Sequence, residues 1–442
     1  MHLKFISAVV AGIEHIANLA STLLIYAAIP IGAKLTKNRL RHGRIRSLWG
    51  TTPILTLALK ASSDRMLGMR SESAVLTNYY ISNDFDWNLK WIIKASGPFR
   101  APVLRLVLAA ALLRYDIFHY FADRGILDPD GRFGIHQDEL DALRRSGKLV
   151  YVFAYGADVR MRERTLALGK WNFCVDCDHP GTYCLCDDRA GEAILQRISD
   201  TSTATVSLGD MLTYFPRTYH VAYWPIDIRH IDYIGVGEHD RVLTIAHAPN
   251  HTHFKGTRYL EQSLERLRRR GIEFNLTVIS GVSNDEVLRL LGKADIIADQ
   301  FIGGSYGYTA LEGLARGKPV LTYIRHSGLT VAADECPFIN ATPDTLDDVL
   351  TWCFHNRQTL QNIGRQGRAY IERHHSIPAV AARLARLYLD TADLPCALVD
   401  RFRSFIADEE MRKNDIPTYA DWHHPWSLAM EARAAALQSF DP

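Results

Sequence analysis

The chain has 442 residues, of which 47% are hydrophobic and 23% are charged. This length suits two globular domains, and we find no repeat or low-complexity tract, which excludes a solenoid or a disordered chain. The formal net charge of +2 gives no broad electrostatic attraction to nucleic acid, so we expect no nucleic-acid partner.

The first 46 residues, 1–46, predict a segment that associates with a membrane. Residues 16–33 form an 18-residue stretch without a charge, and residues 34–46 carry six Lys or Arg and no acid. A helix lying at the membrane surface, held to anionic lipid by the basic residues, fits this pattern. The alternatives are a membrane span and a buried helix followed by a basic loop. The positive residues favour a peripheral position on the inner, cytoplasmic face.

Residues 47–230 predict a first α/β domain. An apolar, helix-like run at 102–113 precedes a short strand that ends in His119, and a later strand begins at Leu149. Polar side chains that follow or end such strands are candidates for chemistry. In this domain they are His119, Tyr155 and Asp158.

A cysteine-rich hairpin, residues 174–186, lies in the same domain. Its thiols form a C-x2-C pair and a C-x-C pair: Cys174, Cys177, Cys184 and Cys186. Four thiolates in two close pairs can close a tetrahedral zinc site, and the absence of a secretory signal favours metal over a disulfide or redox pair. We expect a structural zinc. An iron–sulfur cluster is one alternative, and a zinc site in which Asp178 or His179 replaces one thiolate is another.

Residues 231–395 predict a second α/β domain with polar groups after two strands. The apolar segment 242–249 runs into a loop that holds Lys255, well placed for a phosphate. Further along, the loop 303–305 meets a short helix that carries Glu312. Amides at a helix N-terminus bind phosphate, and a carboxylate one turn in can accept hydrogen bonds from ribose hydroxyls. Because ligands of open α/β sheets bind at the carboxyl ends of strands, the two segments together indicate a nucleotide-sugar site. The alternative is an ordinary tight α/β turn.

The series APNHTHFKGTRYL, ADIIADQF and GSYGYTALEGLARGKPVLTY resembles the C-terminal half of GT-B glycosyltransferases of retaining family 4. The resemblance implies that Lys255 contacts the donor diphosphate and that Glu312 binds the donor ribose. It also places His247 near the family's arginine. The family's first glutamate falls on Gly304, so this chain lacks it. Backbone amides for the donor would come from Ser305, Tyr306 and Gly307.

A looser resemblance to the same family, over about residues 110–230, concerns the acceptor side. It implies that the strand ends near His119 and Asp158 face the cleft. Tyr155 stands where the family often has a histidine, and His119 is the nearest alternative. Residues 223–227 resemble the interdomain linker.

We therefore expect an α/β protein of the GT-B fold, with two Rossmann-like domains and a cleft between them. The N-terminal apolar helix and the zinc hairpin are additions, and residues 396–442 are expected to return to the first domain. The function implied by the resemblance is a hexosyltransferase-type glycosyltransferase of polysaccharide biosynthesis. It would move a sugar from a nucleoside-diphosphate donor to a glycan or lipid-linked acceptor, with retention and without a catalytic metal. The alternatives are a non-catalytic GT-B-like nucleotide- or glycan-binding protein and another user of nucleotide sugars, such as an epimerase.

Overall fold

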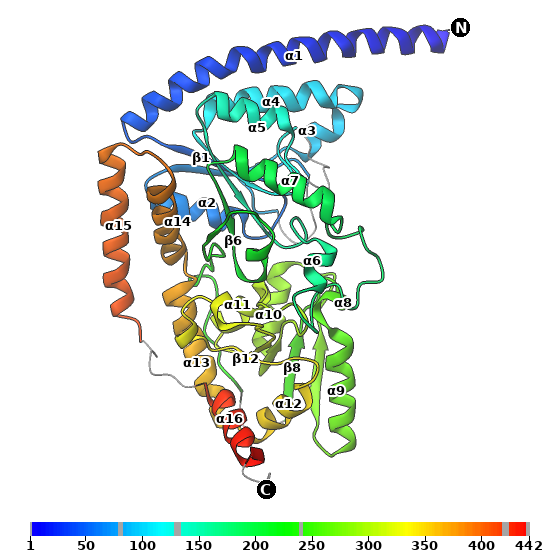
Figure 1. Ribbon diagram of the computed structural model, residues 1–442, viewed down its shortest axis with the longest axis vertical. Helices are drawn as coiled ribbons and strands as arrows, with labels where there is room; N and C mark the ends of the chain where they lie inside the picture. Colours follow the sequence, from blue (N-terminus) through cyan, green and yellow to red (C-terminus); the bar gives the residue numbers. More distant parts are fainter. Residues whose placement is uncertain (1, 78–82, 128–133, 238–241, 418–423, 439–442) are drawn as a thin grey trace. The chain divides into compact units, whose positions relative to one another are not determined.

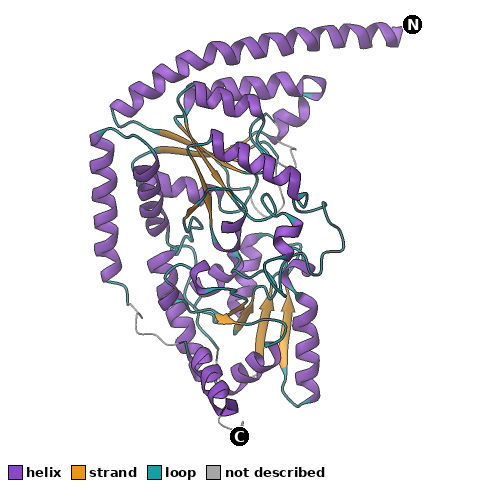
Figure 2. Cartoon of the chain, viewed as in Figure 1, coloured by secondary structure: helices purple, strands orange, loops and turns teal. Residues whose placement is uncertain are grey.

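The computed structural model describes residues 2–77, 83–127, 134–237, 242–417 and 424–438. The chain divides into two compact units, each built on a parallel sheet (Figures 1 and 2). The first unit comprises Met1–Met161, Gly181–Tyr223 and Ala381–Ala407. The second comprises Arg162–Pro180, Trp224–Val380 and Asp408–Pro442. The expected α/β class with two parallel sheets is confirmed, and the N-terminal apolar helix is present.

The first unit has a seven-stranded sheet of order β3-β2-β1-β4-β5-β6-β7, and every pair in it is parallel. The strands are β1 (Arg46–Thr51), β2 (Arg70–Val75), β3 (Trp87–Asn88), β4 (Ile117–Phe121), β5 (Leu149–Phe153), β6 (Ala204–Ser207) and β7 (Tyr219–His220). The helices are α1 (His2–Arg41), α2 (Leu57–Met66), α3 (Lys90–Ala95), α4 (Arg100–Arg114), α5 (Gln137–Arg145) and α7 (Asp188–Thr201).

The strand expected to end at His119 continues for two residues, because Tyr120 and Phe121 are apolar, fully buried and paired with β5. His119 therefore lies in the middle of β4. Its side chain points into the core and not out of the end of the strand.

Helix α1 packs along α4 over its C-terminal half (Figure 1). Gly32 permits this approach, because a Cβ there would lie 2.7 Å from the carbonyl oxygen of Leu112. The Thr36 hydroxyl donates to buried Asp116 at 2.9 Å, and Lys148 donates to Thr36 at 2.6 Å. The basic residues up to Arg41 continue the helix, so the apolar and basic segments form one element.

The second unit has a five-stranded parallel sheet of order β12-β11-β10-β8-β9. Its strands are β8 (Leu243–His247), β9 (Phe274–Val278), β10 (Ile296–Ala298), β11 (Val320–Thr322) and β12 (Ile339–Asn340). Its helices are α6 (Arg162–Leu166), α8 (Thr252–Lys255), α9 (Thr257–Arg269), α10 (Asn284–Lys293), α11 (Tyr308–Ala315), α12 (Leu346–His355), α13 (Arg357–His374) and α16 (Pro425–Gln438). Helices α14 (Ile377–Thr391) and α15 (Cys396–Asn414) carry the chain from this unit to the first one and back.

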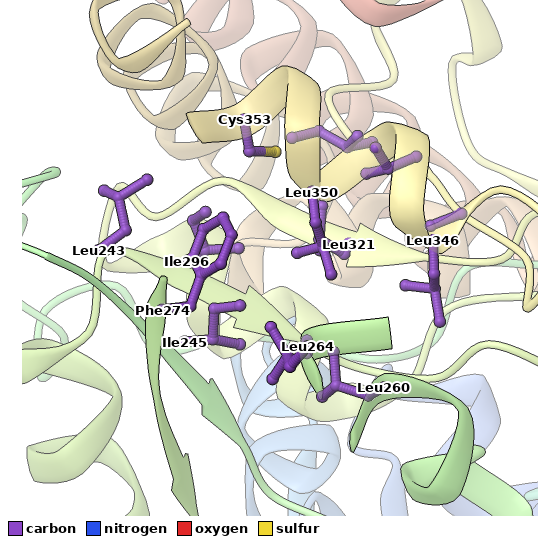
Figure 3. Close-up of a cluster of buried hydrophobic side chains, with 14 of the residues drawn as sticks. Leu243, Ile245, Leu260, Leu264, Phe274, Ile296, Leu321, Leu346, Leu350 and Cys353 are labelled. Carbon is purple, nitrogen blue, oxygen red and sulfur yellow. The ribbon is translucent and has the colours of Figure 1, made fainter. Parts of the chain in front are cut away.

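Helices cover both faces of this second sheet, so its central strand β10 is apolar on both sides. Ile296 and Ala298 belong to one core cluster, together with residues of α9 and α12 such as Leu350 (Figure 3). Ile297, between them, belongs to a second cluster with Leu311 of α11. Alternation along β10 thus fixes α11 on the opposite face from α9 and α12.

The C-terminal segment is divided between the units. Tyr388 of α14 donates a hydrogen bond to Asp64 of the first unit at 2.7 Å. Trp426 of α16 packs in the core of the second unit and donates to the carbonyl of Asn340 at 3.1 Å. The returning stretch is therefore Ala381–Ala407, shorter and earlier than the expected 396–442, of which residues 418–423 and 439–442 lie outside the described residues.

Candidate functional site

The order of the second sheet determines where a ligand would bind. Strand β8 has β9 on one side and β10 on the other, so the chain reverses its direction across the sheet between β8 and β10. Open α/β sheets bind ligands outside the carboxyl ends of the strands at this point. Lys255 follows β8 and Asp299 follows β10 directly, so both lie at that edge.

Asp299 holds this edge together. Its Oδ1 lies 2.7 Å from Lys255 Nζ, and its Oδ2 accepts a hydrogen bond of 2.6 Å from the Gly307 amide. The Asp299 side chain is fully buried, and Gln300 Oε1 accepts a second hydrogen bond from Lys255 Nζ at 3.0 Å. Gly307 is the residue that precedes α11, so a carboxylate sits where the helix N-terminus favours an anion.

The protein groups that are predicted to bind the diphosphate are therefore already bonded to a carboxylate. Lys255 and the Gly307 amide are brought together, as the sequence motif suggests, and Asp299 lies between them. A phosphate that binds here has to share these donors with Asp299 or take them from it.

Glu312 lies one turn into α11 and is buried, with 3% of its surface exposed. Its Oε1 accepts a hydrogen bond of 2.8 Å from Asn284 Nδ2. Burial raises the pKa of Glu312 to about 7, opposed by the Asn284 hydrogen bond and the charge of Arg316 and reinforced by Asp299. Near neutral pH the group titrates, and its ionised form can accept hydrogen bonds from two vicinal hydroxyls.

His247 supplies no charge to the site. Its Nδ1 lies 2.8 Å from the carbonyl oxygen of Ala298, and its Nε2 lies 2.7 Å from the Thr257 hydroxyl. Burial lowers the pKa of His247 to about 4, so the ring is neutral at pH 7. It ties the end of β8 to the end of β10 and to the start of α9.

The side chains of Ser305 and Tyr306 are both buried. The Tyr306 ring stacks on Phe338 with centroids 4.9 Å apart and belongs to the core beneath α11. The carbonyl of Ser305 accepts from Gln300 Nε2. Tyr306 thus anchors the loop from below, and its ring faces the interior.

In the first unit, His119 belongs to a buried polar network. It stacks on Trp49 at 3.9 Å, its Nε2 lies 2.8 Å from the Tyr388 hydroxyl, and its Nδ1 lies 3.2 Å from the carbonyl of Leu48. Asp64 accepts hydrogen bonds from the Trp49 indole at 2.9 Å and the Tyr388 hydroxyl at 2.7 Å. Burial lowers the pKa of His119 to about 3, and the ring is 0% exposed, so no ligand reaches it in this conformation.

Asp158 is hydrogen-bonded to the backbone after two neighbouring strand ends. It accepts hydrogen bonds from the amides of Tyr155 and Gly156 at 2.9 Å and of Ala122 at 3.1 Å. Burial, with a smaller effect of nearby Asp123, raises the pKa of Asp158 to about 7. Asp158 therefore joins the chain after β5 to the chain after β4, and Tyr155 stands on this joined segment.

Asp123 is a polar group that the sequence analysis did not single out. It follows β4 at the point where the first sheet reverses its order, between β1 and β4. Its Oδ1 accepts from the Thr52 hydroxyl, after β1, at 2.6 Å, and its Oδ2 pairs with Arg124 at 2.7 Å. In the second unit, Asp299 and Asn284 were missed in the same way, although an Asp directly after the apolar strand 296–298 is a readable signal.

None of the four hairpin cysteines is in a disulfide, and Cys174 and Cys184 are buried. Among the described residues, which include all four, no group of three or more His, Cys, Asp or Glu is arranged to hold a metal ion. A zinc on this hairpin therefore stays a prediction from the cysteine spacing. The division between the units runs through the hairpin, with Cys177 on the segment 162–180 and Cys186 on the segment 181–223.

No protein-family model and no curated protein matches the sequence. Among solved structures, the chain is similar to Anabaena HepE in complex with UDP-glucose, with a TM-score of 0.49 and 11% identity over 78% of this chain and 99% of that one. For a glycosyltransferase from Rickettsia africae, the TM-score is 0.49 and the identity is 12%, over 79% of this chain and 98% of that one. For WaaG, a glycosyltransferase involved in lipopolysaccharide biosynthesis, the TM-score is 0.43 and the identity is 15%, over 74% of this chain and 95% of that one. The two units of this chain, each built on a parallel sheet, belong to the expected α/β class.

Asp299→Asn tests whether this carboxylate competes with anions for the site. The change keeps the size and removes the charge, so we expect the affinity for inorganic pyrophosphate to rise several-fold. Stability should fall by about 1.5–3 kcal/mol, since hydrogen bonds to a charged group are lost. Titration calorimetry and urea unfolding measure the two effects.

The matched control is Asp295→Asn, at the opposite end of β10. Asp295 accepts from the amides of Thr244 at 2.8 Å and Gly237 at 3.1 Å. Its loss should lower stability and leave pyrophosphate binding unchanged. Equal pyrophosphate affinities of the parent and Asp299→Asn would contradict the competition.

Proposed function

We propose that the protein is a glycosyltransferase that moves a sugar from a nucleoside-diphosphate donor to a hydroxyl of a glycan or lipid-linked acceptor, with retention. The observation that carries this proposal is the pairing of groups at the carboxyl edge of the second sheet. Buried Glu312 suits a ribose, while Lys255 and the Gly307 amide suit a diphosphate. These are the two constant parts of a nucleotide-sugar donor.

The chemistry follows from the leaving group. The bond between the anomeric carbon and the diphosphate oxygen breaks, the acceptor hydroxyl oxygen bonds to that carbon, and its proton leaves with the diphosphate. Lys255 and the positive end of α11 stabilise the negative charge that develops on the diphosphate. We expect these groups to act without a catalytic metal, with Lys255 moving from Asp299 towards the phosphate.

The first unit would bind the acceptor. There we assign Asp158 and His119 positioning roles. Asp158 shapes the backbone at Tyr155, and His119 holds Trp49 in place from within the core. Tyr155 is the member of this set that is only partly buried, and we propose it as the acceptor-side group.

A non-catalytic nucleotide- or glycan-binding protein is the second candidate. It is favoured by one observation, that Asp299 holds both donors of the diphosphate site. A binding protein would retain nucleotide affinity and show no turnover, so the two candidates separate on release of nucleoside diphosphate from a donor.

We also propose that the first unit lies on the inner face of a membrane. A window within Val9–Arg41 is long and apolar enough to cross a bilayer by length and composition, and 22% of it is buried. Ile16 and Leu23 are each 67% exposed. On α3, Trp91 is 70% exposed between Lys90 and Lys94, the pattern of an aromatic anchor at an anionic surface.

The nucleotide site is tested by Lys255→Gln and Glu312→Gln. Lys255→Gln should weaken binding of a nucleoside diphosphate and leave a nucleoside nearly unaffected, because only the diphosphate meets the ammonium. Glu312→Gln should weaken both, roughly ten- to a hundredfold, because charge-assisted hydrogen bonds to the ribose contribute about 1.5–3 kcal/mol. Titration calorimetry with uridine, adenosine, guanosine and their diphosphates measures this, with Glu286→Gln, whose carboxylate pairs with Arg289, as the control.

The pH dependence of this binding gives a second readout. Since the pKa of Glu312 is raised to about 7, its ionised fraction and the nucleoside affinity should rise from pH 6 to pH 8. Glu312→Gln should remove this rise. A nucleoside diphosphate that binds Lys255→Gln as tightly as the parent would show that the diphosphate lies elsewhere.

A structural zinc on the hairpin is a prediction from cysteine spacing alone. We expect close to one zinc per chain in freshly purified, reduced protein. Cys177→Ser should lose the metal and lower stability more than nucleotide affinity, because structural zinc binding is coupled to folding. Elemental analysis that finds no zinc in the parent would contradict the prediction.

Membrane binding is tested by substitution, because removing residues 1–46 would also remove Thr36, a partner of buried Asp116. Ile16→Ser with Leu23→Ser should lower binding to vesicles at least tenfold. Lys34→Gln with Lys37→Gln should abolish only the preference for anionic over neutral vesicles, since salt and charge act on that component alone. Co-sedimentation measures both. Unchanged vesicle binding of the serine variant would contradict the proposal that this face of α1 binds the membrane.

A further inference from the structure

Arg325 is placed against the glycine loop by the backbone. It follows β11, and its amide donates to the carbonyl of Gly304 at 3.0 Å, while the Tyr323 amide donates to the carbonyl of Gln300 at 2.8 Å. The chain after β11 therefore runs beside the loop that leads to Gly307 and α11. This loop is the one that forms the proposed donor site.

The guanidinium of Arg325 fills the space over Gly304. A Cβ at Gly304 would lie 2.5 Å from Arg325 Cζ and 2.5 Å from Nη2, and Gly304 has a φ of +79°. A side chain there would be strained and would collide with the guanidinium. Glycine at position 304 thus allows a cation to lie on the loop.

This cation has weak partners. Its Nη2 lies 3.4 Å from each of two neutral oxygens, the carbonyls of Trp171 and Gly303. Its Nε is buried and has no hydrogen-bond partner, and no ion pair with an Asp or Glu is found for it in the described parts of the chain. A guanidinium has five donors in a planar fork that matches a carboxylate or a phosphate, so this one lacks its usual partner.

Lys255, the other cation beside this loop, differs from Arg325 in its partners. Lys255 already has the carboxylate of Asp299 at 2.7 Å and Gln300 at 3.0 Å. The two cations lie along the same loop, at Gly307 and at Gly304, and only the one at Gly304 lacks an internal anion among the described residues.

We infer that Arg325 and the backbone of Gly303 and Gly304 form a subsite for an anionic oxygen group of the donor, resting on the proposed function. The group is either a donor phosphate oxygen or a carboxylate carried by the transferred sugar, and the same fork would bind both. Arg325 would then be the residue that decides which donors the protein accepts.

The test compares Arg325→Gln and Arg325→Lys with Arg289→Gln, an exposed arginine of the same unit that pairs with Glu286. The probes are inorganic pyrophosphate, UDP-glucose and UDP-glucuronic acid, measured by titration calorimetry, with urea midpoints as a check on folding. Arg325→Gln should weaken at least one probe tenfold or more. Arg325→Lys should restore part of this loss, and Arg289→Gln should stay within twofold of the parent.

The pattern across the probes identifies the source of the anion. Equal losses for all three assign Arg325 to the diphosphate, and a loss confined to UDP-glucuronic acid assigns it to a sugar carboxylate. If the parent binds and Arg325→Gln binds all three as tightly, the subsite is wrong and the proposed function stands. If the parent binds none of the three, the subsite fails, and the proposed function fails as well if the adenosine and guanosine diphosphates also do not bind.

Discussion

The structure of the candidate site depends on one buried carboxylate. Asp299 joins three parts of the second unit, since it bonds to Lys255 after β8, follows β10 in the chain, and accepts from the amide before α11. Without it, an ammonium group and a helix N-terminus would face each other with no anion between them. Asp299 therefore keeps these two donors at positions that a diphosphate could use. A diphosphate has to bind the two donors more tightly than Asp299 does.

The two units share one design, with polar groups where each parallel sheet reverses its order. In the second unit these groups would bind the donor in the function that we propose, with Glu312 buried and titrating near neutral pH. In the first unit they stabilise the protein itself, because His119 is hydrogen-bonded within the core and Asp158 is hydrogen-bonded to backbone amides. The second unit therefore carries the binding chemistry that we propose, and in the same proposal the first unit would hold the acceptor.

Much of this could be predicted from the sequence, and the failures have physical causes. Apolar periodicity and strand-end spacing identified both α/β units, α1 and the loop before Glu312. The predicted strand ended at His119, whereas β4 continues to Phe121. The two aromatic residues after His119 are compatible with either end, and only their pairing with β5 decides between them. Asp299 was missed because its partners, Lys255 and Gly307, become neighbours only when β8 and β10 pair. The cysteine spacing suggested one compact hairpin, whereas the division between the units runs through it.

The most direct test is turnover of the parent protein across a panel of nucleoside-diphosphate sugars, measured as release of the nucleoside diphosphate. The account predicts slow release from at least one donor without acceptor, faster release with a glycan or lipid-linked acceptor, and loss of both in Glu312→Gln. Tight binding of a nucleotide with no release from any donor would contradict the transferase and leave the binding protein. Release that is unchanged in Glu312→Gln would contradict the site itself.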